Sequence, residues 1–460
     1  MRKLSSLILL LFLLLILPLL VFLAQKTQKY LSRATGTPAK IIVDTQNNLG
    51  PLPEPWKALA QGGEEKEKML TSTIPLVKAL SPTYIRIDHI YDYYNVVTKN
   101  PKNELVFDFS KLDQTVDDIL ATNAKPMLSL SYMPLAISAG EITDEPKNWL
   151  DWQEVVRKTV EHYSGKENKN LTDVSYEVWN EPDLFGNWKT YGKKDYRLLY
   201  LYAAKGAAQA KETNSFKIGG PATTAFYKNW LNELIQYVYQ NKLRFDFFSW
   251  HKYSQNPEDF RTDVNYLDSL LARHGGSYLL PKYLTEWGSD SENSARHDTN
   301  FDAAHAVAVI RRLLDRTELI FSFEIKDGPP PKEQVFWGRW GMLTHESVGL
   351  KKKPKYLALE LLTKMGGQRL NLTGEGSWVT GFAAKEEETI KIILTNYDQD
   401  ENHNENIPVT FTNLNPGNYK FKQTNLDGTI FDSVEVVSEN QLTKNIFLPV
   451  NNVVLLELKP

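Results

Sequence analysis

Between residues 55 and 367, short runs of apolar, β-branched and aromatic residues alternate with longer stretches in which apolar residues recur every three or four positions. The short runs predict strands and the longer stretches predict amphipathic helices. Eight strands are predicted in this way, at residues 56–60, 84–88, 126–131, 174–179, 216–219, 245–250, 282–286 and 319–324. Eight strand–helix pairs in about 310 residues favour a closed parallel (β/α)8 barrel, the TIM barrel. A doubly wound open sheet is the alternative, and the lack of a glycine-rich loop after the first strand disfavours it.

Beyond residue 367 the apolar residues alternate with polar ones along short segments separated by turns such as Asn415-Pro416-Gly417. This pattern predicts a C-terminal antiparallel β-sandwich over residues 368–460. Apart from Trp378 the region has no cluster of Trp or His residues, so we expect it to brace the barrel rather than bind a ligand. The barrel domain is assigned to residues 40–367, although a further predicted strand at 40–44, which precedes the eight barrel strands, could pair with the sandwich instead.

The N-terminal segment predicts a membrane anchor. Arg2 and Lys3 precede an uncharged, leucine-rich run over residues 4–24, and polar residues follow it. The run is longer than the apolar part of a cleaved signal peptide, and about 20 apolar residues are enough to cross a bilayer. We therefore expect a signal anchor or transmembrane helix at residues 1–25, a polar linker at 26–39, and the remainder outside the cytoplasm. Cleavage of the anchor would instead give a secreted protein.

Composition excludes several classes of protein. Hydrophobic residues make up 42% of the chain and charged residues 24%, which is typical of a globular protein and not of a disordered or collagen-like one. The net charge of -3, without a basic run, gives no reason to expect a nucleic-acid partner. The absence of cysteine rules out disulfides and thiolate ligands, and the eight histidines show no metal-ligand spacing. No metal or cofactor is therefore expected, and the oligomeric state is left open.

Two glutamates occupy equivalent places in the predicted barrel. Glu181 follows the fourth strand within Trp179-Asn180-Glu181-Pro182, and Pro182 favours an extended conformation for the residue before it. Glu286 ends the seventh strand. Because strands four and seven face each other across an eight-stranded ring, both carboxylates are expected in one cleft at the active face. Such a pair suits glycosidic-bond hydrolysis, with retention if the carboxyl groups lie about 5–5.5 Å apart and inversion at about 6.5–9.5 Å.

With these residues, the chain resembles glycoside hydrolase family 39, the β-xylosidase and α-L-iduronidase family, within the clan A four-seven superfamily of retaining glycosidases. The resemblance covers roughly residues 40–365 and depends on six segments in the family's order: Tyr84-Ile85-Arg86-Ile87-Asp88, Ser131-Tyr132-Met133-Pro134, Glu177-Val178-Trp179-Asn180-Glu181-Pro182-Asp183-Leu184, Ile218-Gly219-Gly220-Pro221-Ala222-Thr223, Phe248-Ser249-Trp250-His251-Lys252-Tyr253 and Lys353-Pro354-Lys355-Tyr356. It implies a retaining glycosidase that cleaves O-glycosidic bonds of oligo- or polysaccharides through a covalent glycosyl-enzyme intermediate.

The resemblance also implies roles for individual residues. Glu181 would be the general acid/base and Glu286 the nucleophile. Asn180 would hydrogen-bond the sugar 2-hydroxyl, and Arg86 would hold Glu286 ionised. His251 or Tyr253 would orient the Glu286 carboxylate. Three tryptophans would serve as stacking platforms for the sugar: Trp287, Trp337 and Trp340. His251 could equally be a buried core histidine, and Trp337 and Trp340 could be packing residues.

Some positions depart from the family pattern. Asp88 stands where the family commonly has His, with His89 next to it, and Ser129 stands where a Glu is frequent. Phe323 takes the place of the usual aromatic residue near the end of strand eight, and Glu324 and Lys326 follow it. We expect these positions to contact the substrate, so xylose specificity does not follow from the resemblance. Two other functions are left open: a barrel that binds glycans without hydrolysing them, and a transglycosylase that remodels surface polysaccharide.

Overall fold

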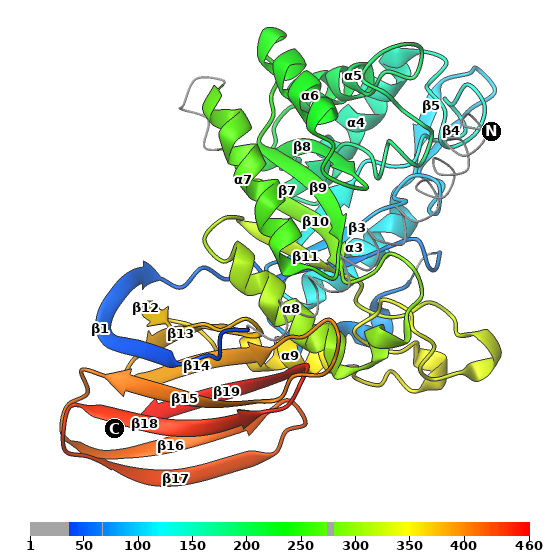
Figure 1. The fold of residues 1–460 in the computed structure, drawn as a ribbon. Coiled ribbons are helices and arrows are strands. Elements are labelled where there is room, and N and C mark those ends of the chain that lie inside the picture. The colour runs from blue at the N-terminus through cyan, green and yellow to red at the C-terminus, as the bar shows by residue number, and fades with distance from the viewer. Residues whose placement is uncertain (1–35, 67, 274–279) are drawn as a thin grey trace, which may run out of the picture.

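Eight parallel strands close into a barrel in the computed structural model, which describes residues 36–66, 68–273 and 280–460 (Figure 1). In chain order these strands are β2 (Ala58–Gln61), β3 (Tyr84–Ile87), β6 (Lys125–Ser129), β7 (Val174–Glu177), β8 (Phe216–Thr223), β9 (Phe247–Tyr253), β10 (Lys282–Gly288) and β11 (Leu319–Phe323). They coincide with the eight predicted strands apart from a few residues at their ends. The ring closes through β11 and β2, which excludes the open doubly wound sheet. The barrel prediction is confirmed.

A helix follows each barrel strand and covers the outside of the ring. The helices are α2 (Ile74–Ala79), α3 (Ser110–Ala121), α4 (Trp149–Ser164), α5 (Tyr196–Gln209), α6 (Lys228–Gln240), α7 (Pro257–Arg273), α8 (Asn300–Leu313) and α9 (Pro354–Leu362). Helix α4 illustrates their construction, since Asn148 accepts a hydrogen bond from the backbone N–H of Leu150 and so caps the first turn. Its residues Trp152, Val156 and Val160 recur every four positions and are fully buried. A small hairpin, β4 (Val97–Lys99) and β5 (Leu105–Phe107), precedes α3 and was not predicted.

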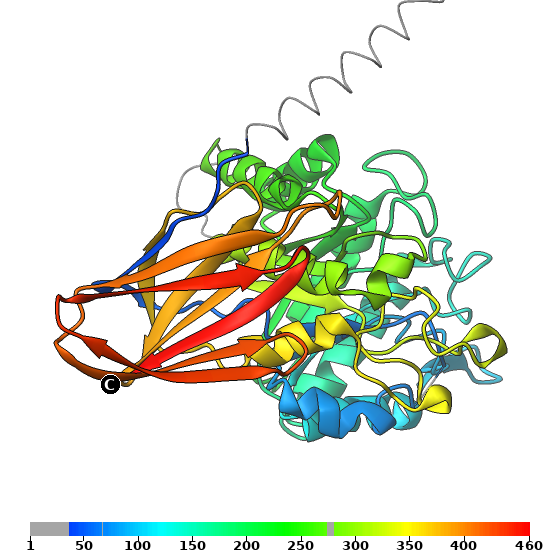
Figure 2. The same ribbon diagram turned by 60° about the horizontal axis from the view of Figure 1, so that its bottom comes forward.

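The C-terminal domain is one continuous nine-stranded sheet that curls until its edge strands, β17 and β18, lie close together (Figure 2). Its strands are β1 (Ile41–Pro51), β12 (Gln368–Thr373), β13 (Val379–Glu386), β14 (Thr389–Asn396), β15 (Glu405–Thr412), β16 (Gly417–Asn425), β17 (Ile430–Val437), β18 (Gln441–Leu448) and β19 (Asn452–Lys459). Strand β1 lies in this sheet rather than in the barrel, antiparallel to β12 and parallel to β15. Side chains on the inner face of β1, Ile41 and Val43, are fully buried in the core of this domain.

Helix α8 packs between the barrel and the sheet. Phe301, Ala304 and Ala308 on this helix form a small apolar cluster with Tyr397, which follows β14. At the other end of the helix, Arg311 donates two hydrogen bonds to the Glu375 carboxylate, at 3.0 and 2.8 Å. This combination of apolar and charge-assisted contacts supports the expected bracing role of the C-terminal domain.

The structure bears only partly on the predicted membrane anchor. Across 36–66, 68–273 and 280–460, no helix is both long and apolar enough to span a bilayer. The expected anchor at residues 1–25, and the linker as far as residue 35, lie outside the described residues.

Candidate active site

Glu181 and Glu286 come together at the C-terminal ends of the barrel strands. Glu286 lies within β10, and Glu181 lies in the loop that follows β7. One carboxylate oxygen of each residue and a ring nitrogen of His251, on β9, all lie within 4.8 Å of one another. Both glutamates line a cleft of about 860 Å³. The cleft is therefore open and holds both carboxyl groups.

The backbone at Glu181 differs from the prediction. Pro182 favours an extended conformation for the residue before it, yet Glu181 has a φ of 46°, in the left-handed region. Hydrogen bonds to both sides of the residue explain the difference: its N–H donates to Ala222 O on β8 at 2.9 Å, and its carbonyl accepts from Phe185 N at 2.7 Å. A non-glycine residue held in this region costs on the order of 1–3 kcal/mol. The loop therefore holds the Glu181 side chain over the barrel at the expense of local strain.

His251 lies between the two acids and is fully buried. Its Nδ1 is 2.9 Å from Glu181 Oε1 and 3.5 Å from Glu286 Oε2, so its closer partner is the acid for which no contact was predicted. Burial lowers the pKa of His251, which favours the neutral imidazole. Nε2 has no hydrogen-bond partner. Since an unpaired buried N–H costs more than an unpaired lone pair, the proton belongs on Nδ1, which donates it to Glu181.

Glu286 is held mainly by Tyr253, whose hydroxyl donates to Oε1 at 2.5 Å. Arg86 was expected to pair with the same carboxylate, but its Nη1 lies 3.8 Å from Glu286 Oε2. The guanidinium is closer to Glu177, with 2.7 Å between Nε and Oε2. Sequence reasoning missed Glu177 as the principal partner of Arg86. Its signal was present, because a carboxylate within an otherwise apolar barrel strand requires a buried cation.

The side chain of Asn180 is oriented by two protein groups. Its Oδ1 accepts from Arg86 Nη2 at 2.8 Å, which assigns the amide oxygen to that side. Its Nδ2 donates to the hydroxyl of Tyr132 at 2.9 Å, a contact that the sequence did not reveal. That bond uses one of the two amide hydrogens. The other is available to a substrate hydroxyl in the cleft that Asn180 lines.

Burial and neighbouring charges shift the pKa values of Glu181 and Glu286 by different amounts. Burial raises the pKa of Glu181 to about 8, and the nearby carboxylate of Asp183 adds to the rise. Burial also raises the pKa of Glu286, to about 7, where Arg86 and the Tyr253 hydroxyl oppose the increase. Because the two groups repel each other when both are ionised, one of them holds a proton at neutral pH. The hydrogen bond from Tyr253 favours ionised Glu286, whereas the carboxylate of Asp183 disfavours ionised Glu181, so the proton is favoured on Glu181.

The comparisons identify the family. Residues 39–427 match the model of glycosyl hydrolases family 39. The chain belongs to glycosyl hydrolase family 39. It is 29% identical over 346 residues to a β-xylosidase of Caldicellulosiruptor saccharolyticus, covering 68% of this chain and 69% of that protein. It is 25% identical to a β-xylosidase of Geobacillus stearothermophilus, covering 58% of each chain. The family 39 protein is thus a glycosidase.

The fold of this family 39 glycosidase is also that of solved relatives. A monomeric β-xylosidase of Caulobacter crescentus CB15 superposes with a TM-score of 0.78 over 92% of this chain and 99% of its own, at 22% identity. A family 39 enzyme of Xanthomonas axonopodis pv. citri superposes with a TM-score of 0.76 over 92% of this chain and 98% of its own, at 20% identity. At these identities the likeness supports the fold and nothing finer.

The three predicted stacking platforms of the family 39 glycosidase have different positions. Trp340 lines the cleft, with the guanidinium of Arg339 3.5 Å from the centre of its ring. Trp287 is buried and packs on Phe260, because neighbouring side chains of β10 point to opposite faces and its neighbour Glu286 takes the cleft side. Trp337 lies beside Arg339 and does not line the cleft. Burial therefore leaves Trp287 no face for a sugar, and the lining of the cleft gives the platform role of Trp337 no support.

Two of the positions that depart from the family 39 pattern, Asp88 and Ser129, differ in whether they reach the cleft. Asp88 lines the cleft although only 5% of it is exposed, and its Oδ1 is buried without a hydrogen-bond partner. Ser129 is fully buried and donates to the carbonyl of Trp179 at 2.8 Å. The expectation of substrate contact thus fails for Ser129, which supports the backbone next to Asn180 instead.

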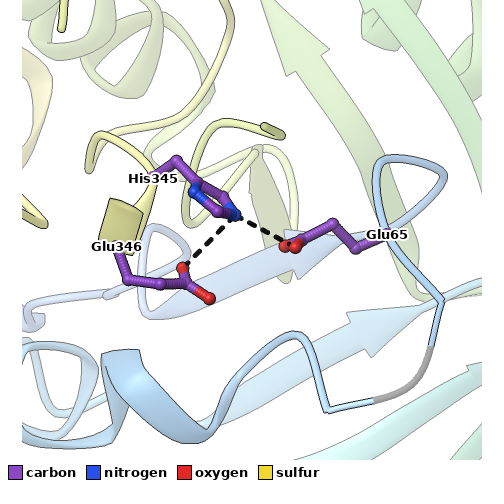
Figure 3. A group of neighbouring side chains, drawn as sticks. All are labelled: Glu65, His345 and Glu346. Atoms are coloured by element: carbon purple, nitrogen blue, oxygen red, sulfur yellow. Dashed lines mark hydrogen bonds and ion pairs between the residues drawn. The ribbon is translucent and has the colours of Figure 1, made fainter. Parts of the chain in front are cut away.

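Among the described residues of the family 39 glycosidase, two groups of side chains bring metal-ligand atoms together. One is Glu181, His251 and Glu286, and the other is Glu65, His345 and Glu346 (Figure 3). In the second group, Lys326 Nζ lies 2.6 Å from Glu65 and 2.5 Å from Glu346, so an ammonium already balances both carboxylates. His345 Nδ1 accepts from the N–H of Ser347, and its Nε2 hydrogen is therefore directed to Glu65 at 3.0 Å. The group is a charge-balanced network and does not favour a cation.

Proposed function

We propose that this family 39 glycosidase hydrolyses O-glycosidic bonds of oligo- or polysaccharides with retention of configuration, in the manner of a β-xylosidase. The observation that carries the proposal is the separation of at most 4.8 Å between carboxylate oxygens of Glu181 and Glu286. An inverting enzyme needs about 6.5–9.5 Å between its carboxyl groups to place a water molecule, whereas direct attack needs about 5–5.5 Å. The short separation supports direct attack by a carboxylate.

In the first step of the proposed mechanism, Glu286 attacks the anomeric carbon as the bond to the leaving oxygen breaks. Glu181 gives its proton to that oxygen, and an ester joins the sugar to Glu286. In the second step water attacks the anomeric carbon, Glu181 takes a proton from the water, and the bond to Glu286 breaks. The free N–H of Asn180 donates to the sugar 2-hydroxyl, a contact that strengthens in the transition state.

The charges of the cleft favour a neutral sugar over a uronic acid. Three basic side chains line it, and each is paired: Lys252 with Asp263, Arg339 with Glu64 and His89 with Asp92. Asp88 adds a further buried carboxylate. A sugar carboxylate would therefore meet repulsion, without an unpaired basic side chain among the described residues that line the cleft. This supports a xylose-like sugar over the uronic acid implied by the name of a third relative, an α-L-iduronidase of Drosophila melanogaster, which is 27% identical over 116 residues.

The decisive test is covalent labelling. We expect incubation with a 2-deoxy-2-fluoro-β-xyloside to add one fluorosugar to the enzyme, because the fluorine slows the second step and the ester accumulates. Peptide mass spectrometry should place the label on Glu286. The panel should include the corresponding fluoro-iduronoside, which we expect not to react. A label on any residue other than Glu286, or none from any sugar of the panel, would contradict the proposed mechanism.

A bell-shaped pH dependence of kcat/KM is the second expected result. Activity is lost as the pH falls through the pKa of Glu286, since the nucleophile becomes protonated, and as it rises through that of Glu181, since the acid is lost. Burial raises both pKa values, to about 7 and about 8, so the maximum should lie near neutral pH rather than near pH 4–5. Initial rates from pH 4 to 10 on an aryl xyloside would measure both limbs. A maximum below pH 5 would show that neither carboxyl group is raised.

We further propose that residues 1–25 anchor the enzyme in a membrane with its barrel outside the cytoplasm, or export it if they are cleaved. The support comes from the leucine-rich run and the basic residues before it. Hydrolysis is preferred over transglycosylation as the principal activity because the curated relatives are named β-xylosidases; transfer to a sugar acceptor would use the same two acids.

A further inference from the structure

Apolar side chains form one wall of the cleft, next to Glu181. Leu184, Phe185 and Tyr227 line the cleft and expose 57%, 39% and 43% of their surfaces. They come from the loops after β7 and β8, and Glu181 lies in the first of these loops. Large apolar residues that are exposed together inside a polar cleft indicate a surface that a ligand covers.

Tyr227 is held in place relative to the acid. Its hydroxyl lies 3.0 Å from the hydroxyl of Thr224, and the backbone N–H of Thr224 donates to Asp183 Oδ1 at 3.0 Å. The Thr224 hydroxyl also donates to the Asp183 carboxylate. Because Asp183 follows Glu181 by two residues, this chain of contacts links the aromatic ring to the loop that carries the acid. The ring is therefore rigid before any ligand binds, which reduces the entropy cost of using it.

Phe185 is fixed in a similar way. Its N–H donates to the carbonyl of Glu181 at 2.7 Å, and its ring centre lies 5.5 Å from that of Tyr132. Its partly exposed ring thus stands at a defined position beside the acid.

We propose that Leu184, Phe185 and Tyr227 form the subsite for the leaving group, and that this subsite takes a ring with an apolar face, such as a further pyranose unit or an aryl group. The inference rests on the proposed role of Glu181. An acid must come within hydrogen-bond distance of the oxygen that it protonates, so the group attached to that oxygen lies on the Glu181 side of the cleft. Apolar pyranose faces and aryl rings pack on aromatic side chains, whereas a small leaving group such as fluoride makes no such contact.

The test compares three substrates that share a sugar and differ in the leaving group. For Tyr227→Ala we expect kcat/KM on xylobiose and on an aryl xyloside to fall about tenfold, and kcat/KM on xylosyl fluoride to change less than about twofold. Tyr227→Phe keeps the ring and should retain most of the activity on all three substrates. Tyr239→Ala serves as the matched control, since Tyr239 is an exposed tyrosine on α6 that does not line the cleft. Leu184→Ala should repeat the pattern of Tyr227→Ala with a smaller loss.

The possible outcomes distinguish failure of the proposed leaving-group subsite from failure of the proposed hydrolysis. An equal loss on the fluoride and on xylobiose, or no loss on either, would overturn the leaving-group subsite and leave the proposed hydrolysis standing. Failure of the unmodified enzyme to act on all three xylosyl substrates would overturn the xylosidase proposal and the inference with it. A loss confined to substrates with a ring as the leaving group supports both.

Discussion

Glu286→Gln should abolish hydrolysis, with kcat lower by at least about 10⁴-fold, as when an essential nucleophile is removed from other enzymes. Glutamine matches glutamate in shape and can still accept from Tyr253, which donates to Oε1 of the native carboxylate. It cannot form the ester, and it removes the negative charge that faces the developing positive charge of the sugar. The measurement is the initial rate on an aryl xyloside at the pH optimum, with the folded state checked by thermal unfolding.

Two further variants make the Glu286 prediction specific. Glu286→Gly with added azide or formate should regain activity and release a product of inverted configuration, because the small anion occupies the place of the carboxylate and attacks in one step. Tyr253→Phe removes the hydrogen bond to Glu286 but leaves the carboxylate, so its loss should be much smaller, on the order of 10- to 100-fold. If Glu286→Gln kept more than a few per cent of the activity, another residue would have to be the nucleophile.

Glu181→Gln should produce losses that depend on the leaving group. For xylobiose, whose leaving oxygen needs a proton, we expect kcat/KM to fall by about 10³- to 10⁴-fold. For an aryl xyloside with an acidic phenol the first step needs little assistance, so kcat/KM should fall far less. Its kcat should still be low, because water also needs Glu181 as a base in the second step. Steady-state kinetics on both substrates would measure this difference.

Azide provides the control for the Glu181 prediction. It needs no base, so it should accelerate the Glu181→Gln variant on the aryl xyloside and yield a xylosyl azide of retained configuration. The alkaline limb of the pH profile should also disappear, since the group whose raised pKa produces it has been removed. Equal losses on the disaccharide and the aryl substrate would show that Glu181 has a structural role and not the acid/base role.

The parts of the fold that follow from local patterns could be predicted from the sequence. Each barrel strand is a short apolar run, and the ring order places Glu181 and Glu286 together without any knowledge of side-chain contacts. The sequence signalled that Glu177 needs a buried cation but did not assign Arg86 to it, because several carboxylates near the strand ends are compatible with a buried guanidinium and the packing of the barrel decides in favour of Glu177. The conformation of Glu181 was missed for a related reason, as the hydrogen bond to Ala222 lies on another strand.

The apolar side chains that line the cleft beside Glu181 could not be predicted from the sequence either. Leu184 and Phe185 follow Glu181 by three and four residues and read as ordinary loop residues, while Tyr227 belongs to the next strand–helix unit. Only the folded barrel shows that all three are exposed in one cleft. Trp287 shows the opposite error: its place next to Glu286, the proposed nucleophile, suggested a platform, although strand alternation turns its side chain away from the cleft.

The pairing of β1 with β12 and β15 has a consequence for biosynthesis. During translation β1 leaves the ribosome before any strand of the barrel, whereas both of its neighbours leave after the last one. It must therefore wait unpaired until the barrel has been synthesised, and contacts between segments so distant along the chain form slowly. The C-terminal domain also cannot be removed or exchanged as one contiguous segment. Cutting the chain after the barrel would leave β1 attached to the barrel without the strands that it pairs with.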